Sequence, residues 1–393
     1  KTTTVTAANG TGYFVNTTAG AITANLPAGT AGSIVAFKDY LGTFDSNALT
    51  IAPNGSQKIN GDATTDLVVD TEGESITLVY VDDTQGWLVV NDGNNDAGAQ
   101  AQYITATGGT ITTVCTNFKV HTFTGPGTFT VCSVGNAAGS TTVDYLVVAG
   151  GGGANQQYAG GGGAGGYRES SGAATGCYSA SPLGSGVSAL PVSVQGYSIT
   201  VGAGGGAVPA PSGRGITGSN SIFSTITSAG GGGGGAGGSP SPISDAPGLP
   251  GGSGGGAGGF GPGLQPGGTG NTPPVSPSQG NNGGATNVTG GGYASAGGGG
   301  ATVVGLGPTS PTDSAPDAVG GAGATTSING TPTAFAGGGG GGVYSPCLPT
   351  TITNAGGIGG GGPGTRNGSN PLPAASQNGT VNTGGGAGGG GNS

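Results

Sequence analysis

The sequence predicts an all-β protein that continues into a long glycine-rich region, with essentially no α-helix. Apolar and polar residues alternate in short stretches of the first part, glycine supplies 99 of 393 residues, and charged residues make up only 6%. Typical proteins contain about 7% glycine and about 25% charged residues. Acidic residues concentrate in 1–96 and solid glycine runs begin at Gly150. We therefore divide the chain into 1–96, 97–150 and 151–393.

Residues 1–96 have the pattern of half-buried strands. Ile22, Ala24 and Leu26 alternate with polar residues, and a period of two is typical of a strand with one buried face. Asn-Gly or Asp-Gly pairs at 9–10, 54–55, 60–61 and 92–93 predict tight turns between strands. Large apolar residues are few, so we expect association between chains to bury the apolar stripes and cover the strand edges.

Residues 97–150 are predicted to form a β connector. The stretch KVHTFTGPGTFTV predicts a hairpin that turns at Gly125-Pro126-Gly127. Reflection about Pro126 places Phe123 opposite Phe129 and His121 opposite Val131, and aromatic cross-strand pairs contribute roughly 0.2–1 kcal/mol each. A further strand, predicted over 143–148, leads into the first glycine run.

The glycine runs of 151–393 predict a packed fold rather than a linker. Collagen requires glycine at every third position, and flexible linkers usually mix glycine with serine. The left-handed polyproline-II conformation has three residues per turn and no internal hydrogen bonds, so its backbone groups need partners on neighbouring chains. We expect a bundle of such polyglycine-II helices, joined by long loops, from the runs 160–166, 230–238, 251–259, 297–300, 337–342, 356–362 and 384–391.

The first region also resembles a known family. The strings GYFVNTTAGAITANLPAGTAGSIVAFKDYLGTFDSNALTIAPNGSQKINGD and GESITLVYVDDTQGWLVVND resemble the β-structured shaft modules of bacteriophage tail fibres, which are homotrimeric. The resemblance covers nearly all of 1–95. It implies a homotrimer, with trimer-core candidates Phe37, Ile51, Ile59, Leu78 and Trp87.

The rest of the chain resembles the far end of such fibres. A strand like YLVVAGGGG introduces a glycine-rich tip in phage tail proteins, and the architecture of 150–393 is similar to the adhesins of T-even-like long tail fibres. The resemblance implies a virion protein, extracellular once released, that binds a host surface polysaccharide or outer-membrane protein. It also implies that other tail proteins bind through a segment before Lys1, and that no cofactor is needed.

Aromatic and basic residues near the glycine runs are the candidates for receptor binding. A tyrosine combines a flat apolar face with one hydroxyl, which suits sugars and protein receptors. The alternatives are that the aromatic residues cap the bundle and that the arginines maintain solubility. The candidates are Tyr158, Tyr167, Arg168, Phe260, Tyr293, Phe335, Tyr344 and Arg366.

The four cysteines permit two disulfides. We consider Cys177–Cys347, which would join two distant loops, and Cys115–Cys132, although the predicted hairpin places Cys132 opposite Val120. Free thiols are the alternative. No CxxC spacing occurs and there is one histidine, so we predict no zinc site or other metal.

Several function classes are disfavoured. The net charge is −9 and the seven basic residues are scattered, whereas nucleic-acid binding needs clustered Lys and Arg. His121 has no partner pattern for catalysis. Asp313 and Asp317 are close in sequence, and glycosidases use a pair of carboxylates, but the Pro-rich loop around these two residues is typical of a solvated segment. We expect no enzyme; the alternatives are a glycine-rich extracellular filament, an ice-binding protein and a depolymerase.

Overall fold

The computed structural model describes residues 1–91, 102–136, 139–174, 176–209, 213–237, 243–259, 263–288, 293–309, 317–344, 354–367 and 376–391. The chain forms two compact units. The first comprises residues 1–104 with 134–141, and the second comprises 105–133 with 142–393. The strands predicted as a separate connector therefore belong largely to the same unit as the glycine runs.

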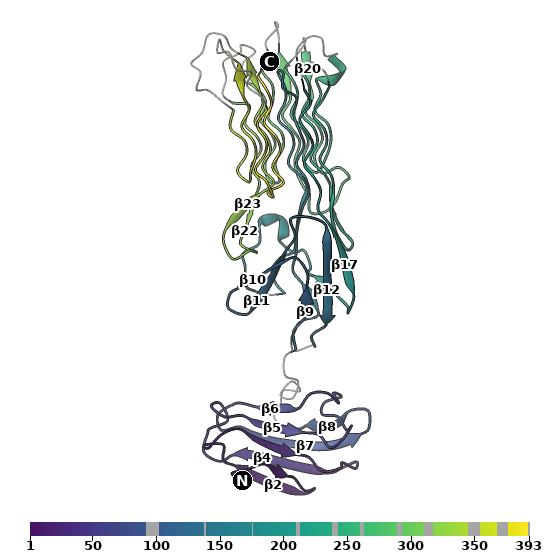
Figure 1. Ribbon diagram of the computed structural model, residues 1–393, viewed down its shortest axis with the longest axis vertical. Helices are drawn as coiled ribbons and strands as arrows, with labels where there is room; N and C mark the ends of the chain where they lie inside the picture. Colours follow the sequence, from purple (N-terminus) through teal and green to yellow (C-terminus); the bar gives the residue numbers. More distant parts are fainter. Residues whose placement is uncertain are drawn as a thin grey trace. The chain divides into compact units, whose positions relative to one another are not determined.

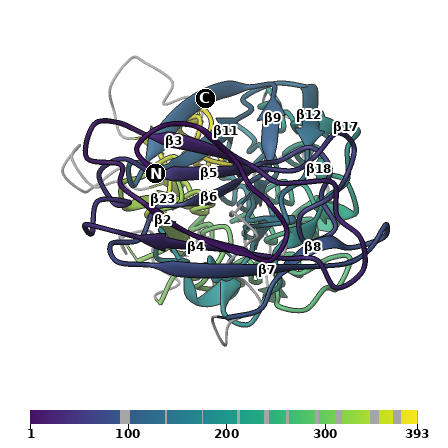
Figure 2. The same ribbon diagram turned by 90° about the horizontal axis from the view of Figure 1, so that it is seen from below.

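The first unit is a sandwich of two four-stranded sheets. One sheet has the order β1-β3-β5-β6 and the other β2-β4-β7-β8, and Figure 2 shows the two layers lying over one another. The strands are β1 (Val5–Thr6), β2 (Thr11–Val15), β3 (Ile22–Asn25), β4 (Ile34–Asp39), β5 (Leu49–Ala52), β6 (Leu67–Val69), β7 (Ser75–Asp82) and β8 (Gly86–Val89).

The first five strands alternate between the two sheets. As a result β1 pairs with β3, β2 with β4, and β3 with β5 in parallel. The remaining pairs, β5–β6, β4–β7 and β7–β8, are antiparallel. The alternation predicted over 22–26 is confirmed, because Ile22, Ala24 and Leu26 are all buried.

The five residues predicted to form a trimer core are buried within a single chain, and this corrects that prediction. Phe37, Ile51, Ile59, Leu78 and Trp87 are at most 3% exposed and belong to one cluster between the two sheets. Tyr13 stacks on Phe37 with ring centroids 5.6 Å apart. The five predicted residues are therefore covered by their own chain, since the sandwich supplies a second layer that a single thin sheet would lack.

The second unit begins with a β-structured part. A five-stranded sheet has the order β19-β18-β17-β12-β9, and a hairpin joins β10 to β11. The strands are β9 (Thr105–Thr107), β10 (Thr110–Val114), β11 (Phe118–Thr122), β12 (Gly127–Ser133), β17 (Gly196–Thr200), β18 (Ser221–Phe223) and β19 (Ile226–Ser228).

The hairpin predicted around Pro126 is wrong. β11 pairs with β10, so the hairpin turns at Cys115–Asn117, and β12 pairs with β17 and β9 instead. The aromatic residues of this stretch contact rings other than the predicted cross-strand partners. The His121 ring meets the Phe129 ring edge-on at 5.1 Å, and Phe129 also meets Phe223 at 5.9 Å.

Short two-stranded ladders and two 3-10 turns complete the regular structure of the described residues. The ladders pair β13 with β16, β14 with β15, β20 with β21, β22 with β23, and β24 with β25. Their bounds are β13 (Thr142–Val143), β14 (Leu146–Val148), β15 (Tyr167–Glu169), β16 (Leu190–Pro191), β20 (Gly263–Gln265), β21 (Thr286–Val288), β22 (Ala324–Thr326), β23 (Thr333–Phe335), β24 (Val343–Tyr344), β25 (Arg366–Asn367), η1 (Pro182–Gly184) and η2 (Ile243–Asp245).

The glycine runs lie side by side as long extended segments, which we call the glycine bundle (Figure 1). Within the second unit, β9–β12, β17, β22 and β23 lie at one end of the bundle, which we call the base. β20 and the C-terminus lie at the other end, which we call the tip.

Hydrogen bonding in the bundle repeats every three residues. Gly160, Gly161 and Gly162 each donate to a different neighbouring segment. Their acceptors are the carbonyls of Gly235, Ala296 and Ala387, at 2.9, 3.0 and 2.7 Å. The next three residues return to the same segments: Gly163, Ala164 and Gly165 donate to Gly232, Gly299 and Gly384. A β-strand, with its period of two, cannot produce this pattern.

The carbonyl groups of the same run are directed to three further segments. The oxygens of Gly161, Gly162 and Gly163 accept from the amides of Gly256, Gly339 and Gly152. The run 160–166 is therefore surrounded by six segments, which together accept from its amides and donate to most of its carbonyls. This placement answers the requirement that buried backbone groups find partners.

A disulfide joins the β10–β11 turn to the loop that follows β15. Cys115 and Cys177 are bonded with their Cα atoms 6.2 Å apart. Both predicted pairings are therefore wrong: Cys115 cannot bond to Cys132, which is an exposed free thiol, and Cys177 cannot bond to Cys347, which lies outside the described residues. Cys115 lies in the turn of the β10–β11 hairpin, and the hairpin around Pro126, on which the pairing with Cys132 was considered, does not form.

Candidate functional site

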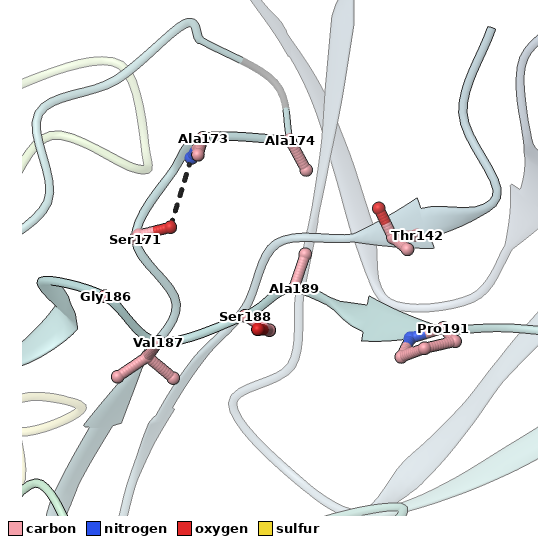
Figure 3. Close-up of a pocket in the computed structure, with 9 residues that line it drawn as sticks. All are labelled: Thr142, Ser171, Ala173, Ala174, Gly186, Val187, Ser188, Ala189 and Pro191. Atoms are coloured by element: carbon pink, nitrogen blue, oxygen red, sulfur yellow. Dashed lines mark hydrogen bonds between the residues drawn. The ribbon is translucent and has the colours of Figure 1, made fainter.

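One open pocket of about 520 Å³ lies near the base. Figure 3 shows its lining, which comes from β13, the loop after β15, and the segment leading into β16. The only side-chain polar groups among these residues are the hydroxyls of Thr142, Ser171 and Ser188. Ser171 accepts a hydrogen bond from the Ala173 amide at 3.4 Å. The pocket therefore offers weak hydrogen bonding, without the carboxylate pair of a glycosidase.

The titratable residues that the sequence singled out have structural partners. The Nδ1 of His121 lies 2.8 Å from the Gly108 carbonyl oxygen, so Nδ1 carries the proton and donates. Asp317 accepts from the Thr309 amide at 3.0 Å, and Asp313 lies outside the described residues. Within the described ranges, no three His, Cys, Asp or Glu side chains gather as metal ligands, and no helix has the length and apolar character needed to cross a membrane.

Two of the predicted aromatic residues meet at the tip. The rings of Tyr158 and Tyr293 stack with centroids 4.6 Å apart and planes inclined by 25°. The Tyr158 carbonyl accepts from the Gly259 amide at 3.0 Å, close to the chain that enters β20. Tyr158 is buried, while Tyr293 is half-buried. The half-buried ring of Tyr293 therefore packs on the buried ring of Tyr158.

Tyr158 holds an unusual backbone conformation. Its φ of +41° lies in the left-handed region, which costs a non-glycine residue about 1–3 kcal/mol. The preceding turn is fixed by Asn155, whose Oδ1 accepts from the Gln157 amide at 2.9 Å and whose Nδ2 donates to the Gly213 carbonyl at 2.7 Å. These bonds hold the turn in the conformation that brings the two rings together.

A second turn of the tip is held by Arg214, which the sequence did not single out. Its guanidinium donates to the carbonyls of Ser244 and Asp245 in η2. These bonds anchor η2. Two aliphatic side chains of the tip are exposed: Ile243 in η2 is 49% exposed, and Leu264 in β20 is 65% exposed. The tip therefore combines stacked tyrosines with exposed aliphatic side chains, and one of its cations is engaged by backbone carbonyls.

Three predicted receptor residues lie at the base instead. Tyr167 is 1% exposed and packs in a cluster with Ala164 and Ala336, against which Phe335 also packs. Arg168 pairs with Val147 in the β14–β15 ladder. Tyr158 and Tyr167 stand at opposite ends of one glycine run, so they cannot belong to one surface. The burial of Tyr167 does not fit a receptor-binding residue and fits the alternative, in which an aromatic residue caps the bundle.

Tyr167 belongs to a buried polar network. Its hydroxyl donates to Oε2 of Glu169 at 2.8 Å, and the same oxygen accepts from the amide and hydroxyl of Ser181 at 2.9 and 2.6 Å. Burial raises the pKa of the Tyr167 hydroxyl well above its ordinary range. The hydroxyl of Tyr178 lies 3.2 Å from the Ser170 carbonyl, and burial likewise raises its pKa. This network ties the loop carrying Cys177 to the base.

The remaining candidates are only partly described. Tyr344 in β24 is aligned with Asn367 in β25, and Val343 with Arg366, in a parallel pair at the tip end of two glycine segments. Phe260 lies outside the described residues. Sequence reasoning missed Asn155, because an Asx turn is not distinguished by composition in a chain rich in asparagine.

A comparison with protein families matches the glycine-rich domain family over residues 122–393. The chain belongs to the glycine-rich domain family. The match begins at the last residue of β11 and includes most of the base and the whole bundle, so the family match and the second compact unit cover nearly the same residues. A search of curated proteins found no match.

Proposed function

We propose that the second unit is a polyglycine-II bundle serving as the receptor-binding tip of a bacteriophage tail fibre. The bundle assignment is supported by the threefold repeat of hydrogen bonds along 160–166 and by the six segments around that run. A left-handed helix with three residues per turn directs successive amides about one third of a turn apart. Hexagonal packing of such helices gives each amide and each carbonyl its own neighbour.

The tip is the part of the unit that suits a receptor. Extended segments cross-linked in this way make a stiff rod, and loops held by a rigid scaffold are the usual place for binding residues. The single observation that carries the proposal is the stacked pair Tyr158–Tyr293, at the same end of the bundle as the exposed Leu264 and Ile243. Aromatic faces with neighbouring hydroxyls and aliphatic groups suit sugars or the loops of an outer-membrane protein.

The remaining features of the function come from the resemblance to tail fibres. We propose that the protein binds its receptor without cleaving it, resides in the virion and joins other tail proteins through its N-terminal side. A homotrimer would have a mass of three times 36.1 kDa, 108.3 kDa. Uniform filaments measured for the purified protein would instead favour the structural alternative.

The experiment is a cell-binding assay with the fluorescently labelled full chain on a panel of Gram-negative strains. We expect saturable binding to some strains and none to others. Treating a binding strain with periodate removes polysaccharide receptors, and shaving it with protease removes protein receptors, so the two receptor classes separate. Absence of strain-specific binding across the panel would contradict the proposal.

A further inference from the structure

Asn-Gly pairs recur in the described part of the chain, and the surroundings of their glycine amides differ. An asparagine that precedes glycine readily loses ammonia, because glycine has no side chain to hinder attack of its amide nitrogen on the preceding carboxamide. This attack requires a glycine amide that is free of other bonds and a backbone that can move. The six pairs lie at 9–10, 54–55, 60–61, 282–283, 329–330 and 378–379.

Four of these glycine amides are held in hydrogen bonds. An amide held in this way reacts only after the surrounding structure opens locally, and the free energy of that opening slows the reaction. Asn9 is also fixed through its side chain, because its Oδ1 accepts from the Ile34 amide at 2.8 Å. The amides of Gly10, Gly61, Gly283 and Gly330 donate to carbonyl oxygens at 2.7, 2.8, 3.0 and 2.8 Å.

The pair at 378–379 is restrained by packing. A Cβ atom on Gly379 would stand 2.3 Å from the Gly385 carbonyl oxygen. The next amide, that of Thr380, donates to the Gly360 carbonyl at 2.8 Å. The segment is therefore fixed in the glycine bundle, and Asn378 cannot close a ring onto Gly379 without displacing its neighbours.

The pair Asn54-Gly55 has none of these restraints. Within the described part of the chain, neither the Gly55 amide nor the Asn54 side chain has a hydrogen-bond partner. A Cβ atom on Gly55 would meet no atom within 4 Å, and residues 54–56 are all exposed. The carboxamide and the amide nitrogen that would attack it are therefore both open to solvent.

The geometry of the turn explains why this amide is free. The Gln57 amide donates to the Asn54 carbonyl at 3.0 Å and closes a four-residue turn. Gly55 holds the second position with a φ of +60°, the left-handed value that this position has in the turns typical of hairpins. Such a turn uses only the amide of its fourth residue, so the amide of its second residue is left to water.

We propose that Asn54 is a site of spontaneous intramolecular deamidation. The Gly55 nitrogen bonds to Cγ of Asn54, the bond from Cγ to the side-chain nitrogen breaks, and ammonia leaves with the proton of the Gly55 amide. Water then opens the five-membered imide at either carbonyl and gives aspartate or isoaspartate. The reaction consumes one water, releases one ammonia and creates one carboxyl group. It concerns the first unit and does not depend on the function proposed for the tip.

The isoaspartate product lengthens the backbone of a turn that positions a clamp. Oε1 of Gln57 accepts from the Gly29 amide at 2.9 Å, and its Nε2 donates to the Gly29 carbonyl at 3.1 Å. We call these two bonds the Gln57 clamp. Gly29 lies so close to Tyr80 that a Cβ atom on it would stand 2.2 Å from the ring. An extra backbone carbon at Asn54 shifts Gln57 and thereby releases Gly29.

The test is peptide mapping of the full chain after ageing in a mildly alkaline buffer. Trypsin cleaves after Lys38 and Lys58, so Asn54 is recovered in a different peptide from Asn9 and from Asn60. In the folded protein we expect aspartate and isoaspartate to accumulate at Asn54 at least about tenfold faster than at the other two, which must open first. In urea, where all three amides are free, the three rates should be comparable.

Asn54→Gln is the matched variant. Glutamine would have to close a six-membered ring, which is much slower, and the exposed side chain makes no hydrogen bond that the substitution would remove. Isoelectric focusing should therefore show more acidic species in the aged wild type than in the aged variant. Hydrogen exchange of the Gly29 amide should be at least about tenfold faster in the aged wild type, because the Gln57 clamp that protects it is lost.

Three results would count against the proposal. Reaction at Asn54 no faster than at Asn9 and Asn60 in the folded protein would overturn it, because the free amide would then not set the rate. Acidic species that accumulate equally in the wild type and in Asn54→Gln would arise at another site. A Gly29 amide that exchanges as slowly after ageing as before would contradict the effect on the Gln57 clamp.

Discussion

Gly162 lies against Gly152 so closely that a Cβ atom on Gly162 would stand 2.1 Å from the Gly152 carbonyl oxygen. Real Cβ atoms do not approach a carbonyl oxygen at this distance, so one backbone would have to move. Both residues belong to the group of segments that share hydrogen bonds around 160–166. The glycines of the bundle are therefore required for close approach of the backbones.

Not every glycine of the bundle should be equally sensitive. Gly162→Ala should lower the stability of the second unit by about 1–3 kcal/mol or more, as overpacking does in a close-packed core. At Gly204 the nearest atom to an added Cβ is the Gly151 oxygen at 3.7 Å, so Gly204→Ala should be neutral or stabilising by about 0.4–1 kcal/mol. Thermal unfolding measures both; equal destabilisation of the two variants would contradict the packing described for the bundle.

The Cys115–Cys177 disulfide should stabilise the second unit. The bond spans 62 residues of sequence, and closing a loop of that size is expected to contribute about 2–4 kcal/mol. Cys115→Ser should therefore lower the unfolding temperature of this unit, and a reductant should have a similar effect on the wild type. Cys132→Ser, at an exposed free thiol, is the matched control and should change little. Equal effects of the two substitutions would exclude this bond.

Asp39 should make the first unit sensitive to acid. Burial alone would raise the pKa of this carboxyl, but hydrogen bonds from the amides of Phe44, Gly73 and Gly42 outweigh it and hold the pKa below its ordinary value. A depressed folded-state pKa gives stability that is present above about pH 4 and lost as pH falls through the folded value.

Asp39→Asn should therefore destabilise the unit at neutral pH and flatten its stability profile below about pH 4. Asp45→Asn, at an exposed carboxylate, should leave the profile close to that of the wild type. Chemical unfolding between pH 2 and pH 7 measures the difference, about 1–3 kcal/mol at neutral pH for loss of charged hydrogen bonds. A wild-type profile for Asp39→Asn would show that the carboxylate does not stabilise the turns that contain Gly42, Phe44 and Gly73.

Buried tyrosines should delay alkaline titration of the second unit. Burial raises the pKa of Tyr145, Tyr167 and Tyr178, so these residues contribute stability that is present below about pH 10 and lost at higher pH. Tyrosinate absorbance should rise in two phases, with the second phase accompanying unfolding. Tyr167→Phe should reduce the second phase, whereas a single reversible phase near pH 10 would contradict the buried network.

The sequence predicted those features that depend on local pattern. Alternation located β3, and the glycine runs marked most of the segments that lie side by side in the bundle. Partners distant in sequence were not predictable. Cys177 is joined to a residue 62 positions away, and β12 takes β17 as its partner across a long loop, so reflection about Pro126 gave the wrong neighbour.

The site was predicted only in part because sequence does not fix which end of a segment a residue reaches. Tyr158 and Tyr167 flank the same run 160–166 and have similar sequence surroundings, yet one stacks on Tyr293 at the tip and the other is buried at the base. Short segments containing Leu249, Leu306 or Pro363 also belong to the bundle. Because these short segments were not recognised as part of the bundle, the loops predicted between the glycine runs were too long.

Comparing substitutions at the two ends of the bundle tests the central claim most directly. Binding of the labelled full chain to a susceptible strain should fall at least tenfold for Tyr293→Ala and for Leu264→Arg at the tip. It should be unchanged for Ile358→Arg and Val381→Arg, which replace residues 73% and 80% exposed on turns near the base. Loss of binding through the base variants, with the tip variants unaffected, would contradict the assignment of the tip as the receptor-binding end.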